Sequence, residues 1–175
     1  GFGHPTGIGL QGEEPGILSD YHDWAAIETA TISFGQGVAV TPLQLVSGMQ
    51  AVANGGVRMR PRIVKQILDD QERVLQSSVP EELGRPLTPK AAQHLRDILE
   101  NVCTRGTGKQ ARVPGYLVAG KTGTAQVVEN GVYSSGRYIA SFLGFAPARD
   151  PRLVVLVKIE EPGTVYWGGV AAAPV

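Results

Sequence analysis

The chain has 175 residues, enough for a single domain that buries a real core. Its 16 basic and 16 acidic side chains cancel, which excludes a general electrostatic attraction to nucleic acid or to an anionic membrane surface. The only cysteine, Cys103, allows no intramolecular disulfide, and no stretch approaches the roughly 20 apolar residues that a membrane span needs.

The first third of the chain combines a glycine-rich stretch with two helix signals. Residues 1–16 hold six glycines and two prolines, which predicts irregular, turn-rich backbone. Residues 24–32 suit a short helix or a buried segment, and Ser33-Phe-Gly-Gln-Gly37 is typical of a tight loop. Thr41-Pro-Leu-Gln44 predicts a helix start, with a capping threonine, a proline in the first position and a glutamine that completes a capping box. We expect this helix to end at Asn54-Gly55-Gly56.

The middle of the chain predicts a hairpin and a second helix. Residues 63–68 and 73–75 flank Asp69-Asp-Gln-Glu72, which indicates a hairpin with a polar tip. Thr88-Pro89 marks the start of a helix with an apolar stripe. The stripe consists of Ala92, Leu95, Ile98, Leu99, Val102 and Cys103. Because Cys103 belongs to this apolar stripe, we expect its thiol to be buried and not to act as a nucleophile. The basic segment 104–114 follows, as the rim of a cleft or as a plain exposed connection.

The segment Lys121-Thr122-Gly123-Thr124 carries most of the chemistry that the sequence offers. Strand formers precede it at residues 116–119 and follow it at residues 125–128, so we expect one extended strand. Alternation along this strand places the lysine and the glycine on one face and the two threonines on the other. The glycine lets another backbone or a substrate approach closely. The segment therefore predicts an edge strand that binds an anionic, peptide-like substrate.

Two further strands follow the lysine segment. Residues 130–131 and 134–136 indicate a turn region, residues 138–145 a strand, residues 147–151 a turn, and residues 152–159 a third strand. These connections are too short for a crossover helix, so the strands should form an antiparallel meander. The near-continuous apolar run of the last strand indicates burial on both faces. We predict an α+β fold, an α/β sandwich whose antiparallel sheet is covered by helices.

Two named patterns compete for the lysine segment. Gly115-x-x-x-x-Gly120-Lys121-Thr122 matches the phosphate-loop pattern, which requires a strand before the first glycine and a helix that begins at the lysine. Here a proline precedes the first glycine, and strand formers follow the lysine, which argues against a nucleotide site. An ordinary strand with a surface lysine is the simplest alternative. The other pattern is the Lys-Thr-Gly signature of penicillin-binding proteins and serine β-lactamases.

Further segments in the right order strengthen the second pattern. They are Ser33-Phe-Gly-Gln-Gly37, Val40-Thr-Pro-Leu-Gln-Leu45, Gly120-Lys-Thr-Gly-Thr-Ala125, Tyr138-Ile-Ala-Ser-Phe-Leu-Gly-Phe-Ala-Pro147 and Tyr166-Trp-Gly-Gly169. Together they closely resemble the C-terminal half of the transpeptidase domain of class B penicillin-binding proteins, the division-type members above all. The resemblance covers nearly the whole chain and is weakest over residues 66–87. It implies that residues 1–175 are the C-terminal portion of a single transpeptidase domain.

The resemblance also implies roles for individual residues. Lys121 would lie beside the nucleophilic serine and help to relay protons, with Thr122 at the cleft and Gly123 kept small for the acyl chain. Thr124 would hold the terminal carboxylate of a D-Ala-D-Ala peptide, and its backbone N–H would supply one oxyanion-hole donor. The substrate would extend the edge strand past Thr124 and Ala125 by β-augmentation. No metal or other cofactor is implied.

One departure from the family pattern stands out. None of the eight serines has a lysine three places on or an asparagine two places on, so the nucleophile motif and its Ser-x-Asn partner are both absent. In the family both motifs precede the segments found here, which leads us to expect a fragment that is inactive by itself. The expected partners of the parent protein are peptidoglycan stem peptides, β-lactams and septal division proteins, with no nucleic acid. The resemblance places this domain on the periplasmic or extracellular side of the cell membrane, with the anchor elsewhere.

Three other functions remain open at this point. A β-lactamase or D,D-carboxypeptidase would use the same fold for hydrolysis, and deacylation rates would separate it from a transpeptidase. A non-catalytic module would keep the fold without the chemistry. A nucleotide-binding protein would show affinity for ATP with magnesium.

Overall fold

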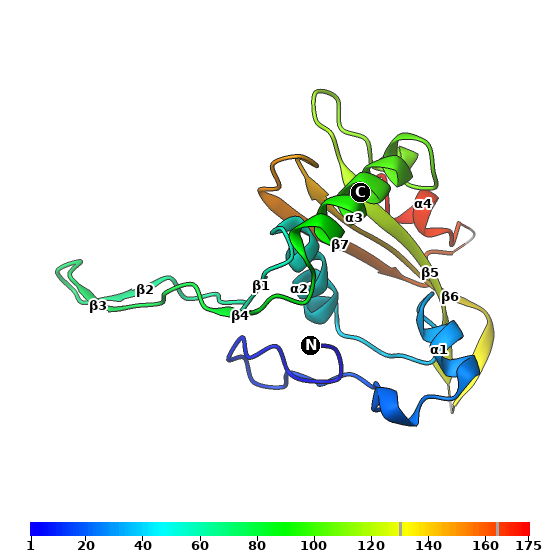
Figure 1. The fold of residues 1–175 in the computed structure, drawn as a ribbon, viewed down its shortest axis with the longest axis horizontal. Helices are drawn as coiled ribbons and strands as arrows, with labels where there is room; N and C mark the ends of the chain where they lie inside the picture. The colour runs from blue at the N-terminus through cyan, green and yellow to red at the C-terminus, as the bar shows by residue number, and fades with distance from the viewer. Residues whose placement is uncertain (130, 164) are drawn as a thin grey trace. The chain divides into compact units, whose positions relative to one another are not determined.

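The structure is a computed structural model that describes residues 1–129, 131–163 and 165–175. Figure 1 shows the ribbon of the chain, which divides into two compact units. The first unit comprises residues 1–48 and 58–84, and the second comprises residues 49–57 and 85–175.

The helices and strands follow one another in a mixed order, with the three longest strands close together near the C-terminus. In chain order they are η1 (Tyr21–Asp23), α1 (Ala26–Ile32), α2 (Pro42–Ala53), β1 (Arg58–Met59), β2 (Gln66–Leu68), β3 (Val74–Ser77), β4 (Glu82–Gly84), α3 (Pro89–Thr104), η2 (Lys109–Ala111), β5 (Ala119–Glu129), β6 (Val132–Ala146), β7 (Leu153–Glu160) and α4 (Gly168–Ala171).

The capping box at the start of α2 is confirmed and also organises the first unit. Thr41 N donates to Gln44 Oε1 over 2.8 Å, and Gln44 N donates to Thr41 Oγ1 over 3.2 Å. The Gln44 amide is buried, and its Nε2 donates to the carbonyl oxygens of His4 at 2.8 Å and Pro15 at 2.7 Å. One glutamine therefore caps the helix and holds the irregular N-terminal segment against it. The helix ends at Ala53, immediately before the predicted stop.

The predicted hairpin is also confirmed, with a shorter first strand than expected and a second strand that continues to Ser77. β2 pairs antiparallel with β3, and β1 pairs antiparallel with β4. Every residue of β2 and β3 is exposed to solvent. Within the predicted segment 24–32, residues 26–32 form the short helix α1, which contains no buried residue, so the helix interpretation holds and the buried one does not.

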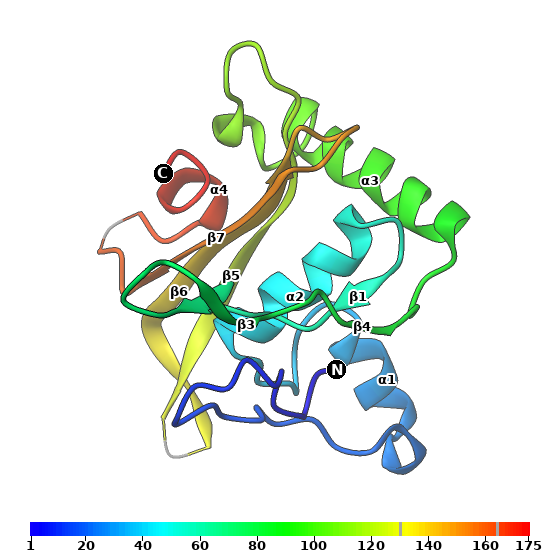
Figure 2. The same cartoon turned by 90° about the vertical axis from the view of Figure 1, so that its left-hand side faces the viewer.

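The second unit contains the predicted antiparallel meander. Its sheet has the order β5-β6-β7, and within the described residues β5 pairs with β6 alone, so the strand that carries Lys121 is an edge strand. Figure 2 shows α3 and α4 on opposite sides of these three strands. Thr88 caps α3 as predicted, because its side chain accepts a hydrogen bond from Ala91 N.

Two clusters of buried side chains lie on the two faces of this sheet. One consists of Met49, Ala53, Ala119, Phe145 and Ala148, with Leu99 of α3 packed against it. The other consists of Cys103, Ala111, Ala140, Phe142, Ala172 and Ala173. Helices thus contact both faces of an antiparallel sheet, as the predicted α+β fold requires.

Three expectations about the strands need correction. β5 begins at Ala119, because Pro114 and Gly115 form a turn that bridges Val113 to Tyr116 and leaves residues 116–118 outside the strand. Residues 134–136 are not a turn but part of β6, where the register shifts in a β-bulge and Gly136 takes a φ of 85°. The turn residue Asn130 lies outside the described residues.

The third correction concerns β7, whose apolar run is not buried on both faces. Leu153 is 66% exposed and Val155 is 53% exposed. Both pair with the end of β6, and the four-residue helix α4 does not cover this part of the sheet. An apolar groove of about 230 Å³ lies there between β7 and the C-terminal residues 172–175.

Candidate active site

The lysine segment lies in the first half of β5, at the open edge of the sheet. Lys121 is exposed, and its Nζ donates to the backbone oxygen of Thr122 over 2.6 Å. In the sheet, Lys121 lies opposite Leu143 of β6, and Gly123 lies opposite Ser141 of the same strand. As predicted, Lys121 and Gly123 share one face of the strand, the face covered by the cluster that contains Met49 of α2 and Leu99 of α3. Thr122 and Thr124 share the other face, on which α4 packs. Ala125 follows on the lysine face and is exposed.

Thr122 is linked to the segment that follows α3. Its Oγ1 lies 2.8 Å from Thr107 Oγ1, so one hydroxyl donates to the other. Thr107 belongs to the basic segment 104–114, which the sequence left open as a cleft rim or a plain connection. This hydrogen bond brings that segment to the lysine strand and favours the rim.

Thr124 is linked to the start of α4. Gly168 N donates to Thr124 Oγ1 over 2.9 Å. A hydroxyl that accepts one hydrogen bond still carries its own hydrogen, which it can donate to another acceptor. Because the Gly168 amide occupies the lone-pair side, the threonine hydrogen is available for an incoming anion such as a carboxylate.

Gly168 allows the start of α4 to lie directly on the strand, and Gly123 allows close packing on the opposite face. A Cβ at position 168 would come within 2.2 Å of Gly123 O and 2.6 Å of Ser141 O, both backbone atoms. A Cβ at position 123 would come within 2.4 Å of Ser141 Oγ. Gly123 therefore has a packing role inside the chain, in addition to the space for an acyl chain that the resemblance implies.

An aromatic stack beside this strand was not predicted as part of the site. The rings of Tyr138 and Tyr166 stack with centroids 4.2 Å apart, and Trp167 lies against Tyr166 with centroids 4.8 Å apart. Tyr138 of β6 lies opposite Gln126 of β5, and Trp167 directly precedes Gly168. The sequence signalled these residues only as motif positions, because a stack between a strand and a distant loop follows from no local pattern.

Cys103 supports the strand from the second cluster and has no open path to the site. Its side chain is 1% exposed, and Gly120 N–H hydrogen bonds to its sulfur. Burial raises the pKa of the thiol, while the Gly120 amide and the nearby Arg112 charge act in the opposite direction with smaller effect. The predicted buried thiol is confirmed.

The described residues offer no other reactive centre of a familiar kind. Within them, no group of three His, Cys, Asp or Glu side chains is placed to hold a metal ion. Among the same residues, no helix has the length and apolar character to cross a membrane. Lys121 begins no helix, so the phosphate-loop geometry is absent from its segment. What the geometry does provide is a cation, two hydroxyls and an open strand edge, which suit an anionic, extended peptide.

Comparison with known proteins identifies the class to which this fold and this strand belong. The family described as "Penicillin binding protein transpeptidase domain" matches residues 1–175. The chain therefore belongs to the penicillin-binding protein transpeptidase family, as the sequence predicts.

Individual relatives agree and are class B penicillin-binding proteins. Stage V sporulation protein D of Bacillus subtilis (strain 168) is 45% identical over 177 residues, which is 100% of this chain and 27% of that protein. Penicillin-binding protein PbpB of Mycolicibacterium smegmatis is 38% identical and covers 99% of this chain and 28% of its own length. The chain thus spans little more than a quarter of these relatives.

Solved structures confirm the fold. The apo crystal structure of penicillin-binding protein 3 from Mycobacterium tuberculosis superposes with a TM-score of 0.89 at 37% identity, over 99% of this chain and 41% of that chain. Structures of the same protein in complex with aztreonam and with ampicillin match equally well.

Proposed function

We propose that the protein carrying this chain is a peptidoglycan D,D-transpeptidase that crosslinks cell-wall peptides through a serine acyl-enzyme and is acylated by β-lactams. Relatives named as probable peptidoglycan D,D-transpeptidases support the reaction, among them PenA of Neisseria meningitidis, 37% identical over 182 residues. Neighbours crystallised with aztreonam and ampicillin support the β-lactam binding. The observation in this chain that carries the proposal is the Thr124 hydroxyl, oriented by Gly168 N at an open strand edge next to Lys121.

Each residue of the lysine segment has a role in this proposal. The stem peptide lies along β5, and its terminal carboxylate accepts from Thr124 Oγ1, with Lys121 adding positive potential. Thr124 N–H donates to the developing oxyanion. Gly123 and Ala125 leave room for the acyl chain, and Thr122, held by Thr107, lines the cleft.

The reaction itself needs a serine from another part of the protein. The serine Oγ attacks the carbonyl of the penultimate D-Ala, and the terminal D-Ala leaves with a proton. An amine of a second stem peptide then displaces the serine and forms the crosslink. None of the eight serines here lies in a Ser-x-x-Lys motif, so we expect these 175 residues alone to form no acyl-enzyme.

The cellular setting completes the proposal. We place residues 1–175 in the C-terminal portion of one transpeptidase domain, on the outer side of the cell membrane, in a protein that acts with septal division proteins. The division-type motifs support this setting, and the name of the Bacillus subtilis relative refers to sporulation.

Labelling of the natural full-length protein with a fluorescent penicillin tests the proposal. The parent should become covalently labelled, and Lys121→Met should slow labelling by on the order of 10²- to 10⁴-fold, as loss of a proton-relay group does. The melting temperature of the Lys121→Met variant shows whether slower labelling comes from lost chemistry or from unfolding. Lys90→Met, at an exposed lysine in the first turn of α3, is the matched control and should label like the parent.

The same experiment separates the other functions. An unlabelled parent would support a non-catalytic module. Rapid release of the label by hydrolysis would support a β-lactamase or a D,D-carboxypeptidase. A stable label together with crosslinked product from a stem-peptide substrate would establish the transpeptidase.

A further inference from the structure

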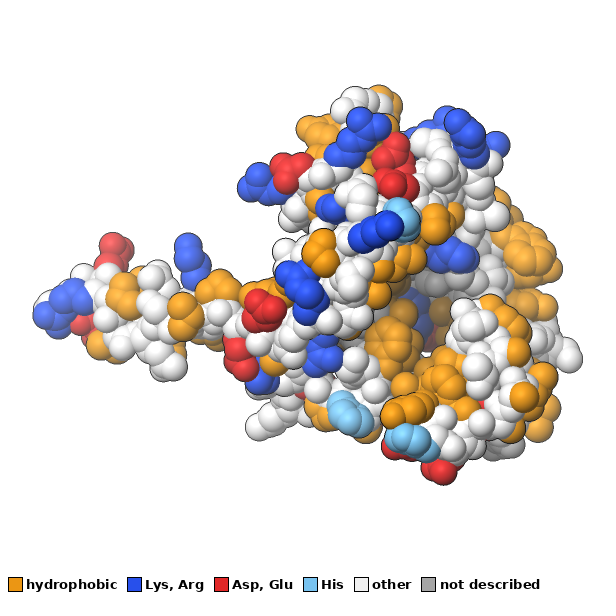
Figure 3. Space-filling model, viewed as in Figure 1, with side chains coloured by type: hydrophobic (Ala, Val, Ile, Leu, Met, Phe, Trp, Pro, Cys, Tyr) orange, Lys and Arg blue, Asp and Glu red, His pale blue; other side chains and the backbone are white. Residues whose placement is uncertain are grey.

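The β2–β3 hairpin of the first unit exposes apolar side chains that no described residue covers. Ile63 is 64% exposed, Ile67 is 47% exposed and Leu75 is 67% exposed. Figure 3 shows apolar atoms between charged ones along this hairpin. Two strands by themselves are marginally stable, and an uncovered apolar hairpin indicates a surface that another segment or another chain covers.

The outer edge of β2 is free to pair with another strand. Ser78 N donates to Lys65 O over 2.9 Å, and Asp69 N donates to Arg73 O over 3.0 Å, so the backbone groups of these two β2-side residues point toward β3. In an antiparallel ladder this direction alternates, which turns the N–H and C=O groups of Gln66 and Leu68 outward. Within the described residues β2 pairs with β3 alone.

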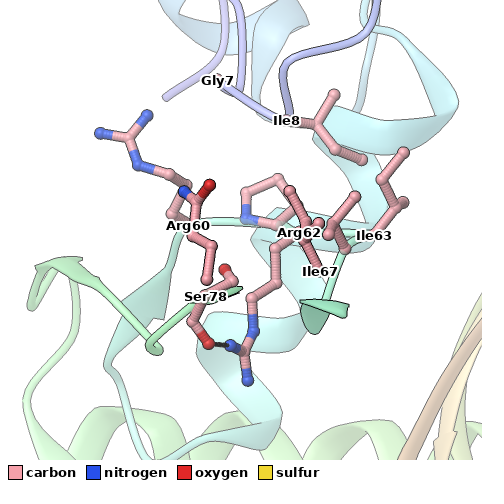
Figure 4. A pocket seen from close by; sticks show the side chains of 10 residues that line it. Gly7, Ile8, Arg60, Arg62, Ile63, Ile67 and Ser78 are labelled. Carbon is pink, nitrogen blue, oxygen red and sulfur yellow. Dashed lines mark hydrogen bonds between the residues drawn. The ribbon is translucent and has the colours of Figure 1, made fainter. Parts of the chain in front are cut away.

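A cavity of about 340 Å³ lies at the root of the hairpin, on the face that carries Ile67. Figure 4 shows the side chains of Ile8, Ile63 and Ile67 around it, with Arg62 hydrogen bonded to the Ser78 backbone oxygen. Arg60 is already neutralised by a bidentate pair with Glu81, at 2.6 and 2.9 Å. Among the described ion pairs, Arg62 and Lys65 have no acidic partner.

Along β2 and its flanking residues, basic side chains precede Ile67 and acidic side chains follow it at the same spacing. Lys65 lies two residues before it and Asp69 two residues after it, on the same face of the strand. Arg62 lies five residues before Ile67 and Glu72 five residues after it. A strand with basic residues on one side of its centre and acidic residues at the same spacing on the other is complementary to itself when paired antiparallel.

We propose that the outer edge of β2 pairs antiparallel with the same edge of a second copy of this chain, with Ile67 at the two-fold centre. In this register Gln66 of each copy faces Leu68 of the other, so outward backbone groups meet outward backbone groups. Each Lys65 faces Asp69 of the second copy, a carboxylate that also pairs with Arg73 of its own chain at 2.7 Å, so Lys65 would add a second cation to that pair. The two Ile67 side chains lie together beside the cavity.

The size of the contact defines what kind of association this is. A standard interface buries about 800 Å² on each partner, far more than a three-residue strand supplies. The pair is therefore transient and depends on concentration, and it forms where copies of the protein are held close together.

Disulfide trapping in the natural full-length protein tests the proposal. Residues opposite each other in a non-hydrogen-bonded pair have Cα atoms about 4.5 Å apart, within the range of about 4.4–6.8 Å that a disulfide bridges. Under mild oxidation, Ile67→Cys should give at least tenfold more covalent dimer than Gln76→Cys, an exposed residue on the same face of β3. The unsubstituted parent gives the background. Adding Lys65→Glu to Ile67→Cys should lower the dimer yield at least fivefold, whereas Lys65→Arg should preserve it.

Other results would overturn the proposal. Equal yields of covalent dimer from Ile67→Cys and Gln76→Cys would mean that the disulfide forms by random collision. A dimer yield that Lys65→Glu does not change would mean the same. Trapping of a different protein in place of a second copy would mean that β2 docks another partner. Because Ile67→Cys can disturb the hairpin, sedimentation of the unsubstituted protein against its Lys65→Glu variant provides a second measurement. The pairing is supported if the unsubstituted protein associates with rising concentration and the Lys65→Glu variant does not. It is contradicted if the two proteins sediment identically.

Discussion

Gly168 N donates a 2.9 Å hydrogen bond to Thr124 Oγ1, although the two residues are 44 positions apart. The bond fixes the start of α4 on the edge strand and leaves the threonine hydrogen free for a substrate. In the proposed function, the Thr124 side chain therefore serves both the packing of α4 and the binding of substrate. Substitutions at Thr124 and Gly168 separate the two effects.

Thr124→Val should impair both functions of the hydroxyl, and Thr124→Ser should preserve both. A hydrogen bond to a charged group contributes about 1.5–3 kcal/mol, so loss of the donor to a substrate or penicillin carboxylate should slow acylation by about 10- to 100-fold. The unpaired Gly168 amide should in addition lower the free energy of unfolding by about 1 kcal/mol. The rate of acylation by penicillin measures the first effect, and denaturant titration of the full-length protein measures the second. Normal acylation of the valine variant would remove Thr124 from carboxylate binding.

Gly168→Ala should loosen α4 from the strand. The new Cβ would meet two backbone oxygens, Gly123 O and Ser141 O, which cannot rotate away. Overpacking of this kind costs about 1–3 kcal/mol, which a denaturant titration resolves. Gly108→Ala is the matched control, since its Cβ would meet only side-chain atoms at 3.3–3.4 Å. Equal stability of the two variants would show that α4 is not held as the structure describes.

Gly123→Ala distinguishes a packing role from a substrate role. Its Cβ would meet Ser141 Oγ, a rotatable group, and Ser141→Ala removes that atom. The double variant should unfold like Ser141→Ala alone, within about 1 kcal/mol. If the substrate needs the space beside the strand, the double variant will nevertheless be acylated more slowly than Ser141→Ala. Equal acylation rates would leave Gly123 with a packing role only.

The fold could be predicted from sequence wherever a local rule decides the conformation. Thr41 and Gln44 form the predicted capping box because both partners lie within one helical turn. The strand alternation at Lys121 and Thr122 follows from the pleat alone. The same local rules misled at residues 134–136, because a glycine with positive φ suits a β-bulge as well as a turn.

The site could be predicted only in part, because its supporting contacts are not local. Nothing in the sequence around Thr124 indicates that Gly168 would hold its hydroxyl, or that Thr107 would reach Thr122. The exposure of Leu153 likewise depends on how far the short helix α4 extends, which composition does not encode. Motif order identified the strand, and tertiary packing determined the environment of each side chain.

Cys103 provides a prediction of pH dependence. The folded chain raises the pKa of this thiol, chiefly by burial, whereas the unfolded chain ionises it near the ordinary value of about 8.5. The unfolded state therefore loses the proton first as pH rises. Stability from this group is complete below about pH 8.5 and declines as pH rises toward the folded pKa. The melting temperature of the parent should accordingly fall more steeply above that pH than that of Cys103→Ala, which has no thiol to titrate.

Thiol labelling checks the same burial independently. At neutral pH a thiol reagent should modify Cys103 in the natural protein only at the rate of unfolding, because the sulfur is 1% exposed and protonated. Denaturant should make the reaction immediate. Val102→Ala, which removes side-chain volume next to the cysteine in α3, should speed labelling without changing the thiol itself. Rapid labelling of the folded parent would contradict the buried position and, with it, the predicted difference in pH dependence.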